Sequence, residues 1–173
     1  MERLGWFIGQ RVELIAGEVV VMPAFNPPHS AATSLTEKAL EAAFGSGFWV
    51  RTGAPISLPG DSEPEPDVSV VPGGPRDYLA AHPTTALLVV EVCESTLRED
   101  RNLKGSLYAA AGLQDYWIVN LVDRQLEVYR KPIPDANEPH GFVYDEVTFF
   151  GPADFVTPLA LPHAKIAVAD LLP

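Results

Sequence analysis

The sequence predicts an α/β or α+β fold in which a mixed β-sheet is flanked by helices. The run "ALLVVEV" (86–92) is almost entirely aliphatic, which is typical of a strand buried inside a sheet. An amphipathic helical pattern over 98–111 and the strand-like "DYWIVNL" (115–121) follow it, an order that indicates a crossover between strands of one sheet. The length of 173 residues suggests a single domain spanning 1–173.

The first half of the chain is predicted to contain a hairpin, a long helix and several strands. "RVELIAGEVVVM" (11–22) has the pattern of two short strands around an Ala16-Gly17 turn. Residues 26–44 carry apolar residues at helical spacing, with prolines at the start and Gly45 directly after the end. Further strands are expected at 48–53, 54–58 and 66–71, and the segment 73–83 is expected to be a loop with a short helix.

The second half continues in the same mixed manner. Gly112 ends the helix over 98–111. The remaining predicted elements are a hairpin of 115–121 and 125–131, a proline-rich surface loop at 132–141, an extended segment at 142–150 and a short terminal element at 166–172.

Composition fits a folded protein of the cytosol. Hydrophobic residues make up 47% of the chain and charged residues 20%, which is ordinary for a globular domain. No apolar run reaches the length of a membrane span, and the N-terminus has no signal-peptide pattern, so a cytoplasmic location without a membrane partner is expected. Cys93 is the only cysteine, which rules out a disulfide within the chain.

The net charge of −11 restricts the possible partners. Twelve Lys and Arg face 23 Asp and Glu, which argues against a constitutive, high-affinity nucleic-acid binder. An enzyme that uses divalent cations to bring acidic residues and phosphate together is still compatible with this charge.

Two acidic residues stand at informative places in predicted strands. Asp67 opens "DVSVV" directly after Pro66, and Glu91 lies inside the apolar run. A carboxylate in an apolar interior must be paired, protonated, solvated or bound to a metal. If the two strands are neighbours, both carboxylates project from one end of the sheet, where Mg²⁺ or Mn²⁺ would suit their oxygens.

The helix that follows adds a third group. Asp100, Lys104 and Tyr108 are spaced four residues apart and so share one stripe of a helix, next to an apolar side of Leu103, Leu107 and Ala110. Lys104 could then reach the end of the strand and hold an attacking water or a developing charge.

These residues resemble the bacterial Uma-type family of restriction-endonuclease-like proteins, which belongs to the PD-(D/E)XK nuclease superfamily. The likeness rests on "PD" at 66–67, on "EV" at 91–92 and "ST" at 95–96, on the spacing to Asp100, Lys104 and Tyr108, and on "AG" and "DYWIV" after them. It also covers "VELIAGEVV", "PPH" before the first long helix, and "PLALPHAKIAVADLL".

The resemblance implies a restriction-endonuclease-like core and a magnesium-dependent endonuclease that cuts DNA. Asp67 and Glu91 would be the metal ligands. The superfamily's lysine normally stands two residues after the glutamate, where this chain has Cys93, so Lys104 would replace it. His29 matches a histidine of the family pattern and would assist. Related nucleases often act in symmetric pairs, so a homodimer is plausible.

Each of these residues also has a plainer interpretation. Asp67 can be a strand-entry residue, Glu91 a partner of an arginine, Lys104 a solvated partner of Asp100, and His29 an ordinary residue of the first helical turn. The rival to the nuclease is an interaction module that kept the fold without catalysis, and cleavage of RNA is a further alternative. Nucleotide-binding, zinc and serine-hydrolase motifs are absent from the sequence.

Overall fold

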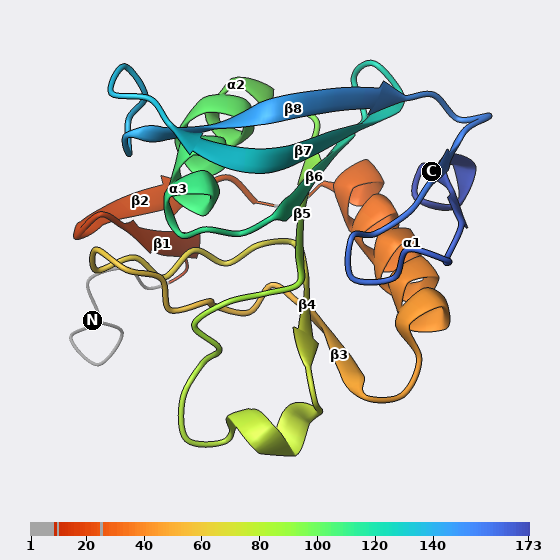
Figure 1. Cartoon of the computed structure of the whole chain (residues 1–173), viewed down its shortest axis with the longest axis horizontal. Helices are drawn as coiled ribbons and strands as arrows, with labels where there is room; N and C mark the ends of the chain where they lie inside the picture. Colours follow the sequence, from red (N-terminus) through yellow and green to blue (C-terminus); the bar gives the residue numbers. More distant parts are fainter. Residues whose placement is uncertain (1–8, 10, 25) are drawn as a thin grey trace.

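A six-stranded mixed sheet forms the centre of the molecule, in the order β3-β4-β5-β6-β7-β8 (Figure 1). Its strands are β3 (Phe48–Thr52), β4 (Val68–Pro72), β5 (Leu88–Cys93), β6 (Asp115–Asn120), β7 (Gln125–Pro134) and β8 (Phe142–Phe150). β5 and β6 are parallel, and all other neighbours in this sheet are antiparallel. The computed structural model describes residue 9, residues 11–24 and residues 26–173. The predicted mixed sheet with flanking helices is confirmed.

The crossover from β5 to β6 is helical, but it is not the single α-helix that the sequence predicts. It consists of α2 (Leu97–Glu99), a π-helical turn η3 (Asp100–Lys104) and α3 (Gly105–Ala110). The Asp100 carbonyl accepts hydrogen bonds from the Gly105 N–H and, at 3.0 Å, from the Tyr116 hydroxyl. A Cβ at position 105 would lie 3.4 Å from that carbonyl oxygen, an ordinary contact, so this approach does not require glycine. A contact with β6 thus accompanies the widened turn.

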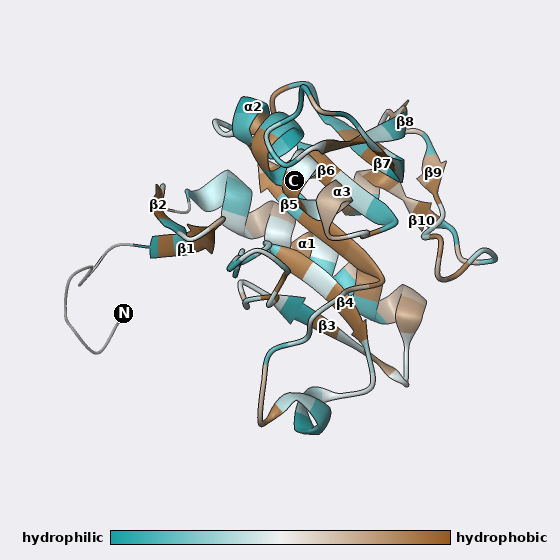
Figure 2. Ribbon diagram, turned by 60° about the vertical axis from the view of Figure 1, so that its left-hand side comes forward, coloured by the Kyte–Doolittle hydropathy of each residue, from teal (hydrophilic) through white to brown (hydrophobic). Residues whose placement is uncertain are grey.

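The two faces of the sheet carry separate cores. Helix α1 (Pro27–Phe44) covers one face, and α3 lies on the other (Figure 1). The alternation along β5 explains this division, because Val90 and Val92 pack on the α1 side whereas Val89 and Cys93 pack on the α3 side. Figure 2 shows hydrophobic residues concentrated along the central strands.

Helix α1 begins and ends where the sequence predicts. Asn26 caps it by accepting the His29 N–H at 2.9 Å, and prolines occupy the first two helical positions. Gly45 follows the last turn with φ of 61°, a conformation that glycine adopts without strain. Within the described part of the chain, no helix is long and apolar enough to cross a membrane.

The N-terminal hairpin forms a two-stranded sheet of its own, as predicted. β1 (Arg11–Ile15) and β2 (Glu18–Met22) are joined by Ala16 and Gly17, both with positive φ, as a tight two-residue hairpin turn requires. The Glu63 N–H donates to the Leu14 carbonyl at 2.7 Å, which ties the hairpin to the loop before β4.

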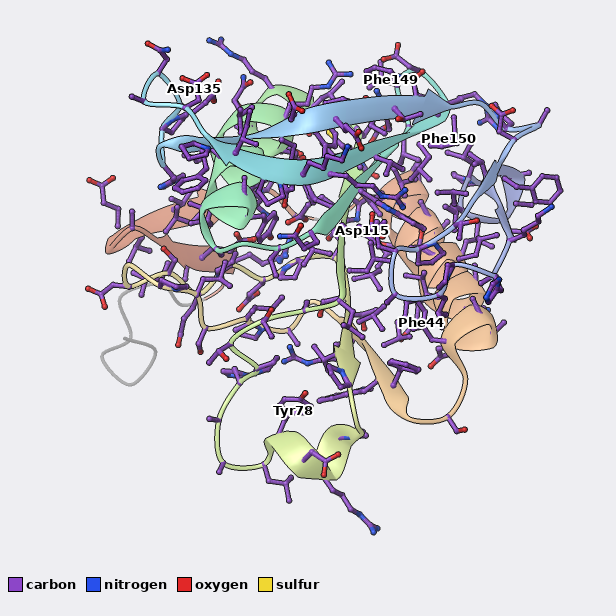
Figure 3. The ribbon with its side chains drawn as sticks, in the orientation of Figure 1. Phe44, Tyr78, Asp115, Asp135, Phe149 and Phe150 are labelled. Carbon is purple, nitrogen blue, oxygen red and sulfur yellow. The ribbon has the colours of Figure 1, made fainter. Side chains whose placement is uncertain are left out.

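The C-terminal segment returns to the α1 face of the sheet. It contains β9 (Phe155–Val156), β10 (Ile166–Ala167) and the 3₁₀ turn η4 (Val168–Asp170). Asp115, in the sheet at the start of β6 (Figure 3), accepts hydrogen bonds from Arg130 Nε and from the Leu159 N–H, both at 2.8 Å. This buried carboxylate therefore fixes the C-terminal segment to the sheet.

Besides the crossover helix, two predicted elements differ from the structure. Residues 54–58 form no strand. Their N–H groups instead bond to the Pro64, Pro83 and Ser62 carbonyls, because the surrounding prolines cannot donate to a regular ladder. The predicted surface loop at 132–141 begins later than expected, because β7 continues to Pro134. The predicted short helix after β4 is present as the 3₁₀ turn η2 (Pro75–Tyr78).

A buried carboxylate on β7 joins the crossover helix to the sheet. Glu127 is fully buried and accepts two hydrogen bonds from the Arg101 guanidinium, at 2.9 and 2.6 Å. The Asn120 amide and the Tyr129 hydroxyl each donate to it at 2.7 Å. These charged hydrogen bonds lower the pKa of Glu127 although its burial acts in the opposite direction.

The substitution Glu127→Gln should lower the free energy of unfolding by about 2 kcal/mol or more, because it weakens several hydrogen bonds to a buried charge. Urea denaturation near neutral pH measures this change. Glu146→Gln is the matched control, since Glu146 forms an exposed ion pair with Lys131 on the neighbouring strands and should contribute little. Equal effects of the two substitutions would contradict the importance of the Glu127 contacts.

Candidate functional site

The start of β4 and the end of β5 bring two carboxylates together. Val68 pairs with Val90 in the antiparallel ladder, so Asp67 and Glu91 lie across from each other at one end of the sheet. The Val92 N–H donates to Asp67 Oδ2 at 2.8 Å, and the Asp67 N–H lies 3.4 Å from Glu91 Oε2. Both side chains are buried. The two strands are neighbours, as predicted.

Lys104 extends from η3 into this pair. Its Nζ lies 3.0 Å from Glu91 Oε1, and the side chain is only 4% exposed. The solvated ion pair of the plainer interpretation is therefore wrong. Tyr108 donates its hydroxyl to the same Glu91 oxygen at 2.7 Å. Asp100, Lys104 and Tyr108 all face inward, but Ala110 of the predicted apolar side is exposed.

Cys93 explains why the lysine comes from the helix. It lies two residues beyond Glu91 on β5 and so points to the same face of the sheet. The thiol is fully buried, and desolvation raises its pKa to about 12, so it stays protonated. Cys93 therefore acts as a small core residue here, and the only ammonium group at Glu91 among the described residues is that of Lys104.

Glu13 on β1 is a site residue that the sequence analysis did not single out. Its Oε1 lies 3.1 Å from Lys104 Nζ, so the ammonium contacts both Glu13 on β1 and Glu91 on β5. The side chain is 2% exposed. A signal was available in the sequence, because the alternation of the strand puts Glu13 on the inward side with Ile15, where a core residue is expected.

His29 reaches the site from the first turn of α1. Its Nε2 lies 3.1 Å from Asp67 Oδ2, and its Nδ1 lies 3.4 Å from Thr33 Oγ1. The N-cap residue Asn26 also donates its side-chain amide to Glu94, which follows β5. The start of α1 is therefore attached to the same end of the sheet as Asp67 and Glu91. All four residues that the sequence analysis proposed converge, although their catalytic roles remain predictions.

The cluster carries more negative than positive charge. Burial raises the pKa of Glu91 well above its usual value and also raises the pKa of Glu13 and of Asp100. Burial alone would lower the pKa of Lys104, but the charges of the surrounding carboxylates outweigh it and raise that pKa. A buried surplus of carboxylates is costly, and an added cation would offset it.

The donor set suits a hard divalent cation. Asp67 and Glu91 offer carboxylate oxygens, the ligand type that Mg²⁺ and Mn²⁺ favour. Glu13 Oε2 is buried without a hydrogen-bond partner among the described residues. Across the described ranges, no group of three or more His, Cys, Asp or Glu side chains is arranged to hold a metal. The protein would therefore supply a pair of carboxylates, and water or substrate oxygens would complete the shell, as Mg²⁺ often requires.

The cluster opens to the surface through a small cavity of about 50 Å³. Its walls come from β1, the start of α1, the segment before β4, and the turn after β5. Glu65 and Glu94 stand in these walls, together with Arg11. The entrance is thus also largely acidic, which adds to the need for a cation if an anionic substrate binds there.

Comparisons with known proteins bear on the fold and the family of the chain. A crystal structure of "a putative nuclease belonging to DUF820" from Anabaena variabilis ATCC 29413 superimposes with a TM-score of 0.69 and 18% sequence identity. The match covers 92% of this chain and 88% of that chain, which shows that the two share a fold. No curated protein matches the sequence.

The family model Uma2, described as "Putative restriction endonuclease", matches residues 7–169 and therefore nearly the whole chain. The expected resemblance to this family is confirmed. The protein belongs to the Uma2 family of restriction-endonuclease-like proteins.

Proposed function

We propose that the protein is a divalent-metal-dependent endonuclease that hydrolyses phosphodiester bonds of DNA. The observation that supports this most directly is the convergence of Asp67, Glu91 and Lys104 from three different segments at one end of the sheet. Membership of the Uma2 family supports a nuclease of this general class.

Asp67 and Glu91 would hold Mg²⁺ or Mn²⁺ through their carboxylate oxygens. When bound, the cation supplies a Lewis acid that polarises a phosphoryl oxygen and lowers the pKa of a coordinated water. Lys104 would place a positive charge beside Glu91. That charge would stabilise the negative charge that develops on the phosphoryl oxygens during attack.

The remaining side chains would keep this arrangement in place. Tyr108 would hold Glu91 through its hydroxyl, and Glu13 would hold the Lys104 ammonium. His29 donates Nε2–H to Asp67 when it is in the corresponding neutral tautomer, and so orients the carboxylate that would bind the metal. In this role His29 is a positioning residue.

Cleavage of supercoiled plasmid DNA in Mg²⁺ or Mn²⁺ tests the proposal. Asp67→Asn and Glu91→Gln should each reduce the rate by about a hundredfold or more, because each removes a charged ligand at the reacting centre. Glu41→Gln on the exposed side of α1 is the matched control and should leave the rate unchanged. Cleavage that survives both site substitutions would refute the assignment, and activity on RNA alone would redirect it to that substrate.

Removal of the buried ammonium should destabilise the protein in a way that metal reverses. We expect Lys104→Met to lower the free energy of unfolding by about 3–5 kcal/mol, because Glu13, Glu91 and Asp100 lose their cation. Excess Mn²⁺ should recover part of this loss, since it neutralises the same cluster. Lys38→Met, on the exposed side of α1, is the control. An unchanged loss with Mn²⁺ present would argue against a cation at this cluster.

Metal binding should tighten as the pH rises. Burial raises the pKa of Glu91 and of Glu13, so at lower pH a larger fraction of the protein carries protons that compete with the cation. Calorimetric titration with Mn²⁺ between about pH 6 and about pH 8, in buffers of different ionisation heat, measures both the affinity and the protons released. An affinity independent of pH, with no proton release, would show that the cation binds elsewhere.

A further inference from the structure

An apolar hollow of about 240 Å³ lies beside the candidate site. It is enclosed between the β1–β2 hairpin on one side and α2 and η3 on the other. Its apolar walls are formed by Ile15, Val20, Val21, Met22, Pro23 and Leu103. Thr96, Asp100 and Lys104 line both this hollow and the acidic cavity that leads to Glu91, so the two spaces adjoin.

The chemistry of the hollow differs from that of the cavity next to it. Apart from Thr96, Glu99, Asp100 and Lys104, its walls offer apolar surface to a ligand, so a bare phosphate would gain little from entering it. Its volume is below the range typical of sites for drug-sized molecules, which limits the occupant to about one ring system. Val21 is 55% exposed on β2 and belongs to this wall, so an apolar surface is left open to water beside a charged site.

The nucleobases of the proposed DNA substrate fit both the apolar walls and the small volume of this hollow. A nucleobase has two apolar faces and a polar edge, and it is attached to the phosphate backbone at a short distance. In a duplex its faces are covered by neighbouring bases, so only an unstacked base could enter the hollow. Burial of a base also provides affinity that does not depend on positively charged surface. This chain, with a net charge of −11, has little such surface.

We propose that this hollow binds one unstacked nucleobase next to the phosphate that is cleaved, so that the preferred substrate is single-stranded or locally unpaired DNA. This inference rests on the proposed nuclease function, because it takes the adjoining acidic cavity as the place of the phosphate. It adds a base-binding site, formed by the hairpin and by Leu103, to the carboxylates and Lys104.

Binding of oligonucleotides that contain 2-aminopurine tests the proposal without requiring catalysis. The measurement uses the full chain carrying Asp67→Asn, with one DNA sequence presented as a single strand, a matched duplex and a duplex with a central mismatch at the probe. Single-stranded and mismatched DNA should bind at least about tenfold more tightly than the matched duplex, and the probe's fluorescence should report an unstacked base.

Two substitutions change the hollow without changing its charge. Val21→Gln makes its open wall polar, and Leu103→Gln makes a second wall polar; each should weaken binding of the single strand by about tenfold. Val147→Gln is the matched control, because Val147 is an exposed valine on the edge strand β8, and it should have no effect. Thermal unfolding checks that the variants are folded.

The outcomes separate this inference from the proposed function. Equal binding of the single strand and the matched duplex, or full binding by both folded variants, would overturn the base-binding hollow. If the wild-type protein then still cut plasmid DNA with metal, the nuclease function would stand without it. If the protein bound bases but cut no nucleic acid, the base-binding role of the hollow would be supported and the nuclease function would be refuted.

Discussion

The ammonium group of Lys104 is buried among carboxylates from three separate segments of the chain. Glu13 comes from β1, Glu91 from β5 and Asp100 from the crossover helix. Burial alone disfavours the ionised form of each of these acids and raises its pKa. The lysine makes their burial possible, and the acids in turn keep the lysine charged. The packing of the hairpin, the central sheet and the crossover helix therefore depends on the balance of charge between Lys104 and these carboxylates.

The position of Lys104 in the cluster depends on contacts that its helix makes with residues distant in sequence. The π-helical turn places Asp100 and Lys104 inward within five residues, and π-turns are frequent at functional sites. Arg101, in the same turn, is bound by Glu127 on β7. The turn therefore contacts two strands of the sheet, through Lys104 at Glu91 on β5 and through Arg101 at Glu127 on β7. A lysine at the position of Cys93 would lie on β5 itself and would not depend on contacts that hold a helix in place. A lysine on the crossover helix does depend on such contacts.

The parts of the structure that depend on local patterns could be predicted from the sequence. Helix α1 and the hairpin follow from periodicity, capping and turn residues. The prediction of a carboxylate pair depends in addition on the two strands being neighbours, and the ladder between Val68 and Val90 meets that condition. The π-turn could not be predicted, because it involves the Tyr116 hydroxyl on another element. Glu13 was missed for a related reason. The alternation of β1 marks Glu13 as an inward residue, but only the docking of the hairpin brings the side chain to Lys104.

The β1–β2 hairpin lies outside the six-stranded sheet but provides one wall of the carboxylate–lysine cluster. Beyond side-chain packing, its attachment includes a few backbone contacts to the loop before β4 and the contact between Glu13 and Lys104. A segment anchored in this way can detach while the main sheet stays intact, and such partial opening costs less than complete unfolding. Water would then reach the ammonium and the carboxylates together. Substitutions in the loop at residues 58–63 would therefore change how readily this segment opens, without altering the side chains of the cluster itself.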